Sequence, residues 1–424
     1  MVTMKRTQAR FREVGCAITA AAIILLIALV ALPAYAQTEK VLHKFGGPGD
    51  GNGSESGPVF DAAGNLYGTT PQGGGGCGVF GCGIVYQLVP NADGTWAESI
   101  IHRFNGDDGA VPYTAVIFDA QGNLYGTAGQ QGAGNHGSAF ELAPGSNGRW
   151  TETVLHSFTG QDGSEPDGAL LMDSIGQLYG TTVVGGAYGD GVVYRLDRGT
   201  LGWHEVRLFS FGTSPAGFYP SGPLAMDSQG VLYGTTGRTT GVQGGAVYEL
   251  MPHGLIWTVK ALYQFTGGED GNEPYSGVTF DQAGNLYGTT AAGGPANLGV
   301  VFMLHPNGDG TWTESTLYAF QSMSDGGAPL GGITIDAQGN LYGTTSGGGS
   351  SGWGTVFKLT PSAGDSPWSK TVLWEFSGGA DGGQPWGNVI LDGLGNIYGT
   401  TNYGGQRIIP CQRYGCGVVY ELTP

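Results

Sequence analysis

Short runs of alternating apolar and polar residues, broken by glycine-rich turns, occupy the chain from Thr38 onward. Within residues 278–320 the alternation predicts four strands, because successive side chains of a strand point to opposite faces. The predicted strands are 278–281, 286–290, 300–304 and 312–320. Sequences that favour turns (Gly-Asn, Gly-Gly and Pro-Asn-Gly-Asp-Gly) separate them, and no helical periodicity occurs between them. The pattern therefore indicates an all-β unit of four short strands.

This four-strand unit repeats along the chain. A string of the type Leu-Tyr-Gly-Thr-Thr occurs seven times at intervals of 54 to 58 residues, and an Asp precedes every copy by five positions. The copies begin at Leu66, Leu124, Leu178, Leu232, Leu286, Leu341 and Ile397. Four strands in every ~55 residues is close to the size of a β-propeller blade, whereas a parallel β-helix needs a much shorter period. We therefore expect an all-β fold, a seven-bladed β-propeller with four strands per blade.

The two ends of the repeated region complement each other. Residues 38–45 match the fourth strand of other copies, such as residues 151–158, whereas the last copy stops after a third strand at 418–422. We expect the N-terminal strand to complete the C-terminal blade, which would close the ring and leave no open sheet edge.

The first 36 residues have the three parts of a secretory signal peptide. Four basic residues lie among the first twelve positions, an apolar run covers 17–32, and positions 34–36 read Ala-Tyr-Ala. The pattern predicts cleavage before Gln37, with residues 1–36 as the signal peptide and 37–424 as a single propeller domain, secreted or periplasmic. An uncleaved membrane anchor is the alternative, because the apolar run is slightly long for a signal peptide but short for a membrane span. No second apolar run of spanning length follows it.

These repeats resemble the choice-of-anchor tandem repeat GloVer-containing proteins, a bacterial family whose repeat centres on Gly-Asn-Leu-Tyr-Gly-Thr-Thr followed by Gly-Gly and a Val-Phe or Val-Tyr strand. Residues 64–70, 284–290 and 339–345 carry the string intact. The departures from it are Ala128, Gln177 and Val231. The resemblance implies an exported bacterial repeat protein, often with a C-terminal surface-sorting segment, and no particular activity. No sorting segment follows the last repeat of this sequence, so we expect export without surface anchoring.

Composition and charge narrow the range of partners. Of the 424 residues, 83 are Gly, 11% are aromatic and only 12% are charged, and the formal net charge is −17. The aromatic residues supply core material. The acidic balance excludes a basic nucleic-acid-binding protein, because phosphate recognition needs clustered Lys and Arg. We therefore expect no nucleic-acid partner.

Four cysteines lie beyond the predicted signal peptide. Cys77 and Cys82 form one pair and Cys411 and Cys416 another, and each pair stands just before a predicted third strand. In an oxidising compartment an even number of cysteines at local spacing indicates a disulfide within each pair. Disulfides between the first and seventh blades, which ring closure makes neighbours, and a four-cysteine zinc site are the alternatives.

The Asp that stands five positions before each Leu-Tyr-Gly-Thr-Thr string is called the turn aspartate here. A second set of aspartates, called the crossover aspartates, stands eleven positions before the turn aspartates, in sequences of the form Asp-Gly-x-x-Pro that join one blade to the next. The set is Asp108, Asp162, Asp270, Asp325 and Asp381, with Asp50 in a first copy that has Ser in place of Pro. Repeated carboxylates in an acidic chain could bind calcium. The simpler interpretation is a turn in which the Asp side chain bonds to nearby backbone. No cofactor other than calcium is expected.

Three histidines recur at one repeat position near the end of the fourth strand. The seven residues at this position are His43, His102, His156, Phe209, Tyr263, Tyr318 and Trp374. We interpret it as a position for a flat ring in packing, rather than for a proton donor or a metal ligand. Glutamates recur in the same strand and are interpreted as facing solvent: Glu39, Glu98, Glu152, Glu205 and Glu314.

The candidate ligand site lies on the face where the loops between second and third strands meet the connections between blades. There the residue after the Pro position varies between repeats, and it is aromatic at Tyr113, Tyr275 and Trp386. Such rings would suit stacking on sugars, and filling of the space between blades is the alternative. The loop of the seventh blade adds a local basic and aromatic cluster: Tyr403, Arg407, Arg413 and Tyr414.

No catalytic set emerges from the sequence. Residues 348–352 fit the G-x-S-x-G pattern and residues 73–78 fit a dinucleotide-binding pattern, but neither lies in the strand-turn-helix that these mechanisms require. We expect a non-enzymatic binding or scaffold propeller, a monomer that recognises an extracellular polysaccharide or protein. The alternatives are a secreted carbohydrate-active enzyme (lyase or hydrolase) or lactonase on the same scaffold, and a structural component of the envelope.

Overall fold

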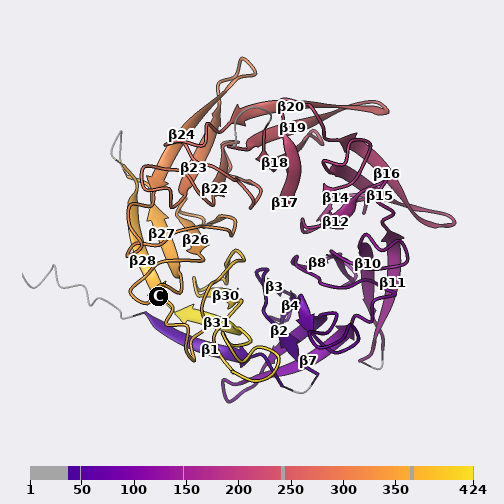
Figure 1. Ribbon diagram of the computed structural model, residues 1–424, viewed down its shortest axis with the longest axis vertical. Helices are drawn as coiled ribbons and strands as arrows, with labels where there is room; N and C mark the ends of the chain where they lie inside the picture. Colours follow the sequence, from indigo (N-terminus) through magenta and orange to yellow (C-terminus); the bar gives the residue numbers. More distant parts are fainter. Residues whose placement is uncertain (1–36, 48, 147, 240–243, 363–366, 424) are drawn as a thin grey trace, which may run out of the picture. The chain divides into compact units, whose positions relative to one another are not determined.

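The computed structural model describes residues 37–423 except 48, 147, 240–243 and 363–366. The predicted signal peptide, residues 1–36, lies outside the described residues. Every regular element in the described part is a β-strand, and residues 39–423 form one unit. The strands of this unit form antiparallel sheets that follow one another around a ring (Figure 1). The fold is a seven-bladed β-propeller, as the repeat predicted.

Each blade runs from a strand at the centre of the ring to a strand at its outer edge (Figure 1). The innermost strands are β3 (Val59–Phe60), β8 (Ile117–Phe118), β13 (Leu171–Met172), β17 (Phe218–Met226), β21 (Thr279–Phe280), β25 (Thr334–Ile335) and β29 (Ile390–Leu391). The second strands are β4 (Leu66–Thr70), β9 (Leu124–Ala128), β14 (Leu178–Val184), β18 (Leu232–Arg238), β22 (Leu286–Thr290), β26 (Leu341–Thr345) and β30 (Ile397–Thr401). The third strands are β6 (Ile84–Pro90), β10 (Ser138–Pro144), β15 (Val192–Gly199), β19 (Ala246–His253), β23 (Val300–Pro306), β27 (Thr355–Thr360) and β31 (Val418–Thr423). The outer strands are β7 (Trp96–Arg103), β11 (Trp150–Ser157), β16 (Gly202–Ser210), β20 (Ile256–Gln264), β24 (Trp312–Ala319), β28 (Ser369–Glu375) and β1 (Thr38–Lys44).

Three short strands lie outside this scheme. β2 (Gly51–Asn52) pairs with β5 (Gln72–Gly73), and β12 (Ser164–Pro166) pairs with β14, which gives the third blade a fifth strand. The four strands predicted within residues 278–320 correspond to β21, β22, β23 and β24. The innermost strand is shorter than predicted, because only two of its residues pair with the second strand.

The seventh blade closes the ring with strands from both ends of the described chain. Its sheet has the order β1-β31-β30-β29, so the N-terminal strand lies beside the last strand of the chain. The predicted pairing is therefore confirmed.

The turn aspartate of each repeat organises the hairpin between the first and second strands. In the first copy, Asp61 Oδ1 accepts hydrogen bonds from the backbone N–H groups of Ala63 and Asn65, and Asp61 Oδ2 accepts one from the Tyr67 hydroxyl at 3.0 Å. The tyrosine also packs against the next blade, with its ring 5.0 Å from that of Phe118. One carboxylate thus satisfies the turn and fixes a ring that fills the space between blades.

The glycine of the repeated string makes room for an aromatic ring of the same blade. Gly180 in β14 is the register partner of Tyr194 in β15, and a Cβ atom on this glycine would lie 2.4 Å from the tyrosine hydroxyl. The glycine therefore makes room for a ring on the adjacent strand of its own blade, not for the approach of a neighbouring blade.

Replacing Gly180 with Ala is expected to lower the free energy of unfolding by about 1 to 3 kcal/mol, as overpacking of a dense core does. Chemical denaturation would measure it. Gly393→Ala is the matched control, since a Cβ there meets nothing within 4 Å. Equal stability of the two variants would contradict the close contact with Tyr194.

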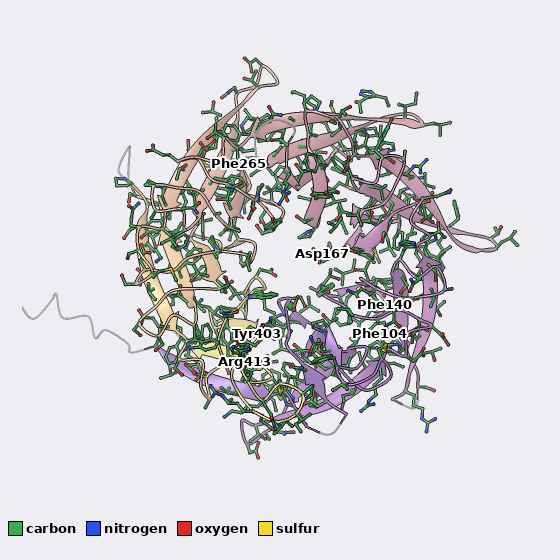
Figure 2. All side chains as sticks on the ribbon, viewed as in Figure 1. Phe104, Phe140, Asp167, Phe265, Tyr403 and Arg413 are labelled. Atoms are coloured by element: carbon green, nitrogen blue, oxygen red, sulfur yellow. A yellow bond between two sulfur atoms is a disulfide. The ribbon has the colours of Figure 1, made fainter. Side chains whose placement is uncertain are left out.

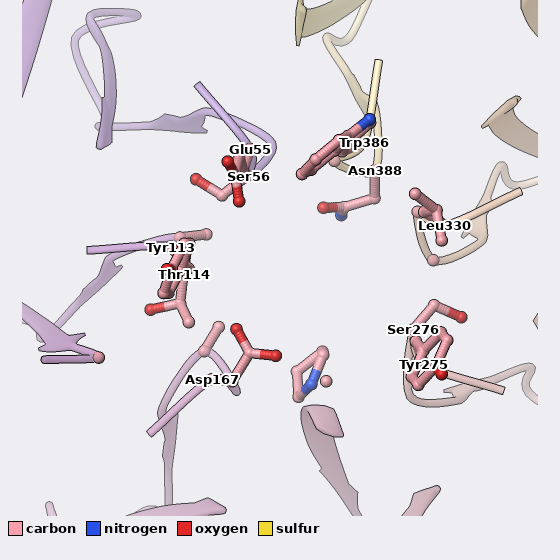
Figure 3. A pocket seen from close by; sticks show the side chains of 18 of the residues that line it. Glu55, Ser56, Tyr113, Thr114, Asp167, Tyr275, Ser276, Leu330, Trp386 and Asn388 are labelled. Atoms are coloured by element: carbon pink, nitrogen blue, oxygen red, sulfur yellow. The ribbon is translucent and has the colours of Figure 1, made fainter. Parts of the chain in front are cut away.

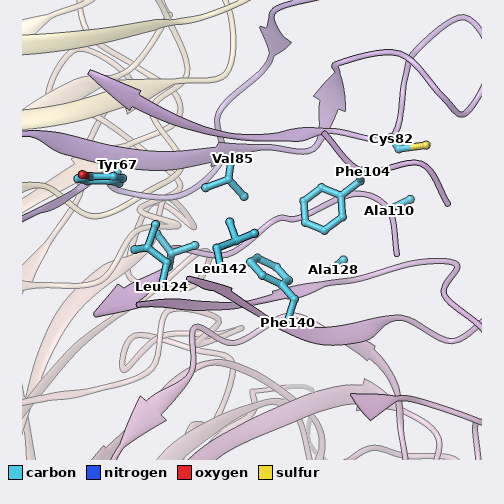
Figure 4. Close-up of a cluster of buried hydrophobic side chains, with 10 residues drawn as sticks. Tyr67, Cys82, Val85, Phe104, Ala110, Leu124, Ala128, Phe140 and Leu142 are labelled. Carbon is cyan, nitrogen blue, oxygen red and sulfur yellow. The ribbon is translucent and has the colours of Figure 1, made fainter. Parts of the chain in front are cut away.

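The hydrophobic core lies between neighbouring blades rather than inside each one. Phe104 follows the outer strand of the first blade, and its ring centroid lies 5.2 Å from that of Phe140 in the second blade (Figures 2 and 4). Both rings are essentially inaccessible to solvent. The same contact recurs at every interface, with centroid separations of 5.0 to 5.5 Å, in the pairs Phe45–Tyr86, Phe158–Tyr194, Phe211–Tyr248, Phe265–Phe302, Phe320–Phe357 and Phe376–Tyr420.

Candidate functional site

The connection into each blade carries its variable residue to the centre of the ring. The residue two positions before this variable residue has a positive φ in every repeat: Gly53, Val111, Glu165, Tyr219, Glu273, Ala328 and Gln384. Its backbone N–H donates to a carbonyl of the preceding blade, as from Val111 to Cys82 O at 2.8 Å and from Gln384 to Trp353 O at 2.6 Å. In six repeats a Pro follows, and its ring fixes φ. A residue other than Gly rarely adopts positive φ, so the bond to the preceding blade stabilises an otherwise unfavourable turn.

These connections surround a central cavity of about 560 Å³ (Figure 3). Six of the seven variable residues line it: Glu55, Tyr113, Asp167, Tyr275, Leu330 and Trp386. The seventh, Ser221, is buried, and Gly222 and Pro223 take its place in the cavity wall. The structure therefore brings together Tyr113, Tyr275 and Trp386, the three rings singled out from the sequence.

Two carboxyl groups project into this cavity without a partner. Figure 3 shows Glu55 and Asp167 pointing toward its open centre. Burial, and secondarily the charge of Asp167, raises the pKa of Glu55 to about 8. Burial, with the charge of Glu165, raises the pKa of Asp167 to about 7. No side-chain hydrogen bond or ion pair to either group occurs among the described residues.

A smaller cavity of about 210 Å³ adjoins the central one at the seventh blade. Tyr403, Arg413 and Tyr414 line it, and it shares Glu55 and Trp386 with the central cavity. The guanidinium of Arg413 lies 4.9 Å from the ring centroid of Tyr414, whose ring is 5.2 Å from that of Tyr403. Figure 2 shows Tyr403 and Arg413 together on this blade.

The observed cluster at the seventh blade differs from the predicted one at two residues. Arg407 does not line either cavity, and its guanidinium instead donates to the carbonyl of Gly378 at 3.2 Å. Trp353, which sequence reasoning missed, joins the aromatic group with its ring 6.5 Å from that of Tyr403. Its signal in the sequence was a large ring in the loop before the third strand of the sixth blade, where other repeats have no Trp.

The cysteines form two local disulfides. Cys77 bonds to Cys82 and Cys411 bonds to Cys416. The pairing within each loop is confirmed, and neither a cross-blade disulfide nor a four-cysteine zinc site is formed. Cys411 lies in the wall of the smaller cavity, so its disulfide closes the loop that carries Arg413 and Tyr414.

The crossover aspartates close the connections between blades. Asp108 accepts from the backbone N–H of Asn105 at 3.0 Å and from the His102 ring at 3.1 Å. Backbone donors or neighbouring hydroxyl groups contact the other members in the same way: Asp50, Asp162, Asp270, Asp325 and Asp381. These bonds fit the interpretation as turns. Calcium binding at this set stays a prediction.

In five of the seven repeats, the recurring ring position next to these aspartates supplies a hydrogen-bond donor as well as a flat surface. His43, His102 and His156 contact the crossover Asp of their own connection through Nε2, and Tyr263 and Tyr318 do so through their hydroxyl groups. Phe209, which has no donor, stands in the one connection without a crossover Asp. The interpretation as a position for packing alone is therefore wrong.

The five recurring glutamates of the outer strands, predicted to face solvent, lie in a different environment. All five are partly buried, and each faces the crossover Asp of the neighbouring connection. Burial, together with the charge of that Asp, raises the pKa of Glu39, Glu98 and Glu205 to about 7. The repeats carry a signal for this pairing, because Val259 replaces the Glu beside the connection that lacks the Asp.

In the described part of the chain, one set of a ring, a crossover Asp and a Glu has donor atoms close enough together to hold a metal ion. The donor atoms of His43, Asp50 and Glu98 lie within 4.8 Å of one another. His43 Nε2 is 3.3 Å from Asp50 Oδ2 and 3.5 Å from Glu98 Oε1. The same ring, Asp and Glu recur in other blades, where the ring and the Asp are hydrogen-bonded and the Glu lies beside them. We therefore interpret the group as part of the scaffold.

No helix in the described part of the chain has the length and hydropathy needed to cross a membrane.

Two solved structures share the fold. The extracellular domain of a B. thetaiotaomicron protein named as a one-component system matches with a TM-score of 0.54 and 13% sequence identity, over 91% of this chain and 41% of its own. A fungal alcohol oxidase of the AA5 family, in complex with copper, matches with a TM-score of 0.57 and 14% identity, over 92% of this chain and 77% of its own. The chain thus spans less than half the length of the first. At such identities the likeness concerns the fold alone. No curated protein matches the sequence.

The sequence model of one family matches almost the whole chain. It is described as the Gloeobacter/Verrucomicrobia repeat, and it matches residues 29–171, 60–297 and 279–424. These three overlapping ranges contain all seven copies of the Leu-Tyr-Gly-Thr-Thr type of string, so the resemblance read from residues 64–70, 284–290 and 339–345 is confirmed. The chain belongs to the Gloeobacter/Verrucomicrobia repeat family.

Proposed function

We propose that this protein is an exported, non-catalytic binding propeller that takes an extracellular saccharide into its central cavity. One observation carries the proposal: Tyr113, Tyr275 and Trp386, from three separate blades, line a single cavity together with carboxyl groups. Aromatic walls with a few polar groups are typical of small-molecule sites, and a volume of about 560 Å³ suits a short oligosaccharide. The apolar faces of sugar rings stack on such side chains, while the polar groups fix their orientation.

The proposed location outside the cytoplasm is supported by the two disulfides, since such bonds persist in oxidising compartments. We include in the proposal cleavage before Gln37, a secreted or periplasmic mature chain, and action as a monomer. A polysaccharide that offers a chain end or a short branch to the cavity is the expected partner. A protein partner is the other outcome of the experiment below.

A glycan array with purified residues 37–424, run with calcium and again with chelator, tests this function. We expect specific retention that falls at least about tenfold in Trp386→Ala, because stacking contacts of large rings dominate such sites. Tyr188→Ala is the control, since this ring is exposed and does not line the cavity. A blank array, or retention that Trp386→Ala leaves unchanged, would refute saccharide binding in the cavity. Loss of retention with chelator would support calcium at the crossover aspartates.

A carbohydrate-active hydrolase is the second candidate, and the raised pKa values of Glu55 and Asp167 favour it. Carboxyl groups kept protonated near neutral pH can act as general acids in glycoside hydrolysis. Incubation of each array ligand with the protein, followed by mass analysis, distinguishes the candidates. Shortened products that disappear in Glu55→Gln would establish hydrolysis, and unchanged ligands would leave the binding function.

A further inference from the structure

We propose that the saccharide in the central cavity carries a protonated amino group, as oligomers of glucosamine with free amines do, and that Glu55 and Asp167 bind this group. The proposal rests on the saccharide-binding function and names the class of ligand.

The charge of the cavity wall has one sign. Its carboxyl side chains are those of Glu55, Glu165 and Asp167, and no Lys, Arg or His lines the cavity in the described part of the chain. A cation bound among these carboxyl groups favours their ionised form, whereas a uronate or sulfate group finds no opposite charge in the wall. Arg413 and Arg238 lie near the cavity without lining it: Arg413 lines only the smaller cavity, and Arg238 lies close enough to Tyr275 for its charge to offset part of the rise that burial causes in the pKa of that hydroxyl group.

The partly buried carboxyl groups of Glu55 and Asp167 differ from the turn aspartates, the crossover aspartates and Asp197. The turn and crossover aspartates accept hydrogen bonds from backbone and side-chain donors, and Asp197 accepts two from Arg195. Glu55 and Asp167 have no such donor among the described residues. A partly buried carboxyl group without a partner is incompletely solvated, so a ligand that donates several hydrogen bonds and carries a positive charge would offset this cost.

The rings of the cavity fit the same ligand. Tyr113 lies close to both acids, since the charges of Glu55 and Asp167 raise the pKa of its hydroxyl group in addition to burial. Figure 3 shows Tyr113 between Glu55 and Asp167 along one side of the cavity, with Tyr275, Leu330 and Trp386 on the other. An ammonium group near an aromatic face gains cation–π attraction. One side thus suits the amine, and the other suits the apolar face of a sugar ring.

The experiment compares two ligands that differ only in the amine. Residues 37–424 are titrated calorimetrically with a glucosamine oligomer that has free amines, and with its fully N-acetylated counterpart of the same length. We expect the free amine to bind at least about tenfold more tightly, the range that charged hydrogen bonds provide. An oligogalacturonate, which is acidic, is expected not to bind.

Substituted proteins test whether Glu55 and Asp167 cause the preference for the oligomer with free amines. The double variant Glu55→Gln, Asp167→Asn is expected to bind the two oligomers equally. Asp93→Asn, Asp309→Asn removes the same charge from exposed hairpin turns and is expected to keep the preference, which excludes general attraction to an acidic protein. If the cavity double variant does not fold, Glu55→Gln alone is used, and we expect it to reduce the preference.

The failures are distinguishable. Equal binding of both oligomers to the unsubstituted protein, or a preference that survives the cavity substitutions, would overturn the amine inference and leave saccharide binding in place. If neither oligomer nor any neutral glycan binds, the proposed function fails as well.

Discussion

The Phe265→Ala variant is expected to lose about 3 to 5 kcal/mol of unfolding free energy, the usual cost of truncating a fully buried Phe. Phe265 follows β20 of the fourth blade and has no exposed surface. Its ring centroid lies 5.0 Å from that of Phe302 in β23 of the fifth blade. The substitution would leave a cavity at the contact that joins two blades, so we expect the whole ring to unfold at lower denaturant concentration.

Denaturant unfolding followed by tryptophan fluorescence would measure this loss. Leu255→Ala is the control, since that side chain is fully exposed at a hairpin turn of the same blade. A loss below about 1 kcal/mol, the range of ordinary surface substitutions, would contradict a core built from contacts between blades.

Raising the pH from about 5 to about 8 is expected to lower the Tm of the protein by several degrees. The pKa of Glu39, Glu98 and Glu205 is about 7 in the folded protein, above the ordinary value of 4.5, because of burial and the neighbouring crossover Asp. The pKa of Glu152 and Glu314 is raised for the same reasons. The folded state therefore binds more protons than the unfolded state between pH 4.5 and 7. This contribution to stability is complete below about 4.5 and is lost as the pH rises through about 7.

A single substitution isolates this effect. Glu205→Gln keeps the shape of the side chain but cannot ionise beside Asp162, so we expect a higher Tm than that of the unsubstituted protein at pH 8 and little difference at pH 5. The expected gain is on the order of 1 to 3 kcal/mol, because one pKa unit corresponds to about 1.4 kcal/mol and the group keeps partial solvent access. Glu269→Gln, at an exposed position, is the control. An unchanged dependence of Tm on pH in Glu205→Gln would refute the paired carboxyl groups as its cause.

The sequence predicted what each repeat determines by itself. The strands at 286–290 and 300–304, the closure by residues 38–45, and the meeting of Tyr113, Tyr275 and Trp386 all follow from alternation and from the equal placement of seven connections. These features depend only on period and topology.

Contacts that depend on packing across a blade interface could not be predicted from one repeat. Glu205 lies on the outer strand of the third blade, and Asp162 lies in the connection that leads from the second blade to the third. Within the sequence of its own strand, Glu205 therefore looks like a surface residue. The space against Gly180 belongs to a ring fourteen residues away, Tyr194, which only the register reveals. A comparison of the seven copies with one another would have found the first of these, since Phe209 and Val259 both accompany the missing crossover Asp.

In every connection the residue with positive φ, which holds the chain in place, is a different residue from the variable one, which lines the cavity in six of the seven connections. The turn at Val111 or Gln384 is fixed by its own backbone bond to the preceding blade, and the residue two positions later lines the cavity. Seven such positions in this one protein already carry six different amino acids. The ring is therefore a scaffold in which the side chains at the six cavity-lining positions can change, by evolution or by engineering, while the backbone that supports them stays the same.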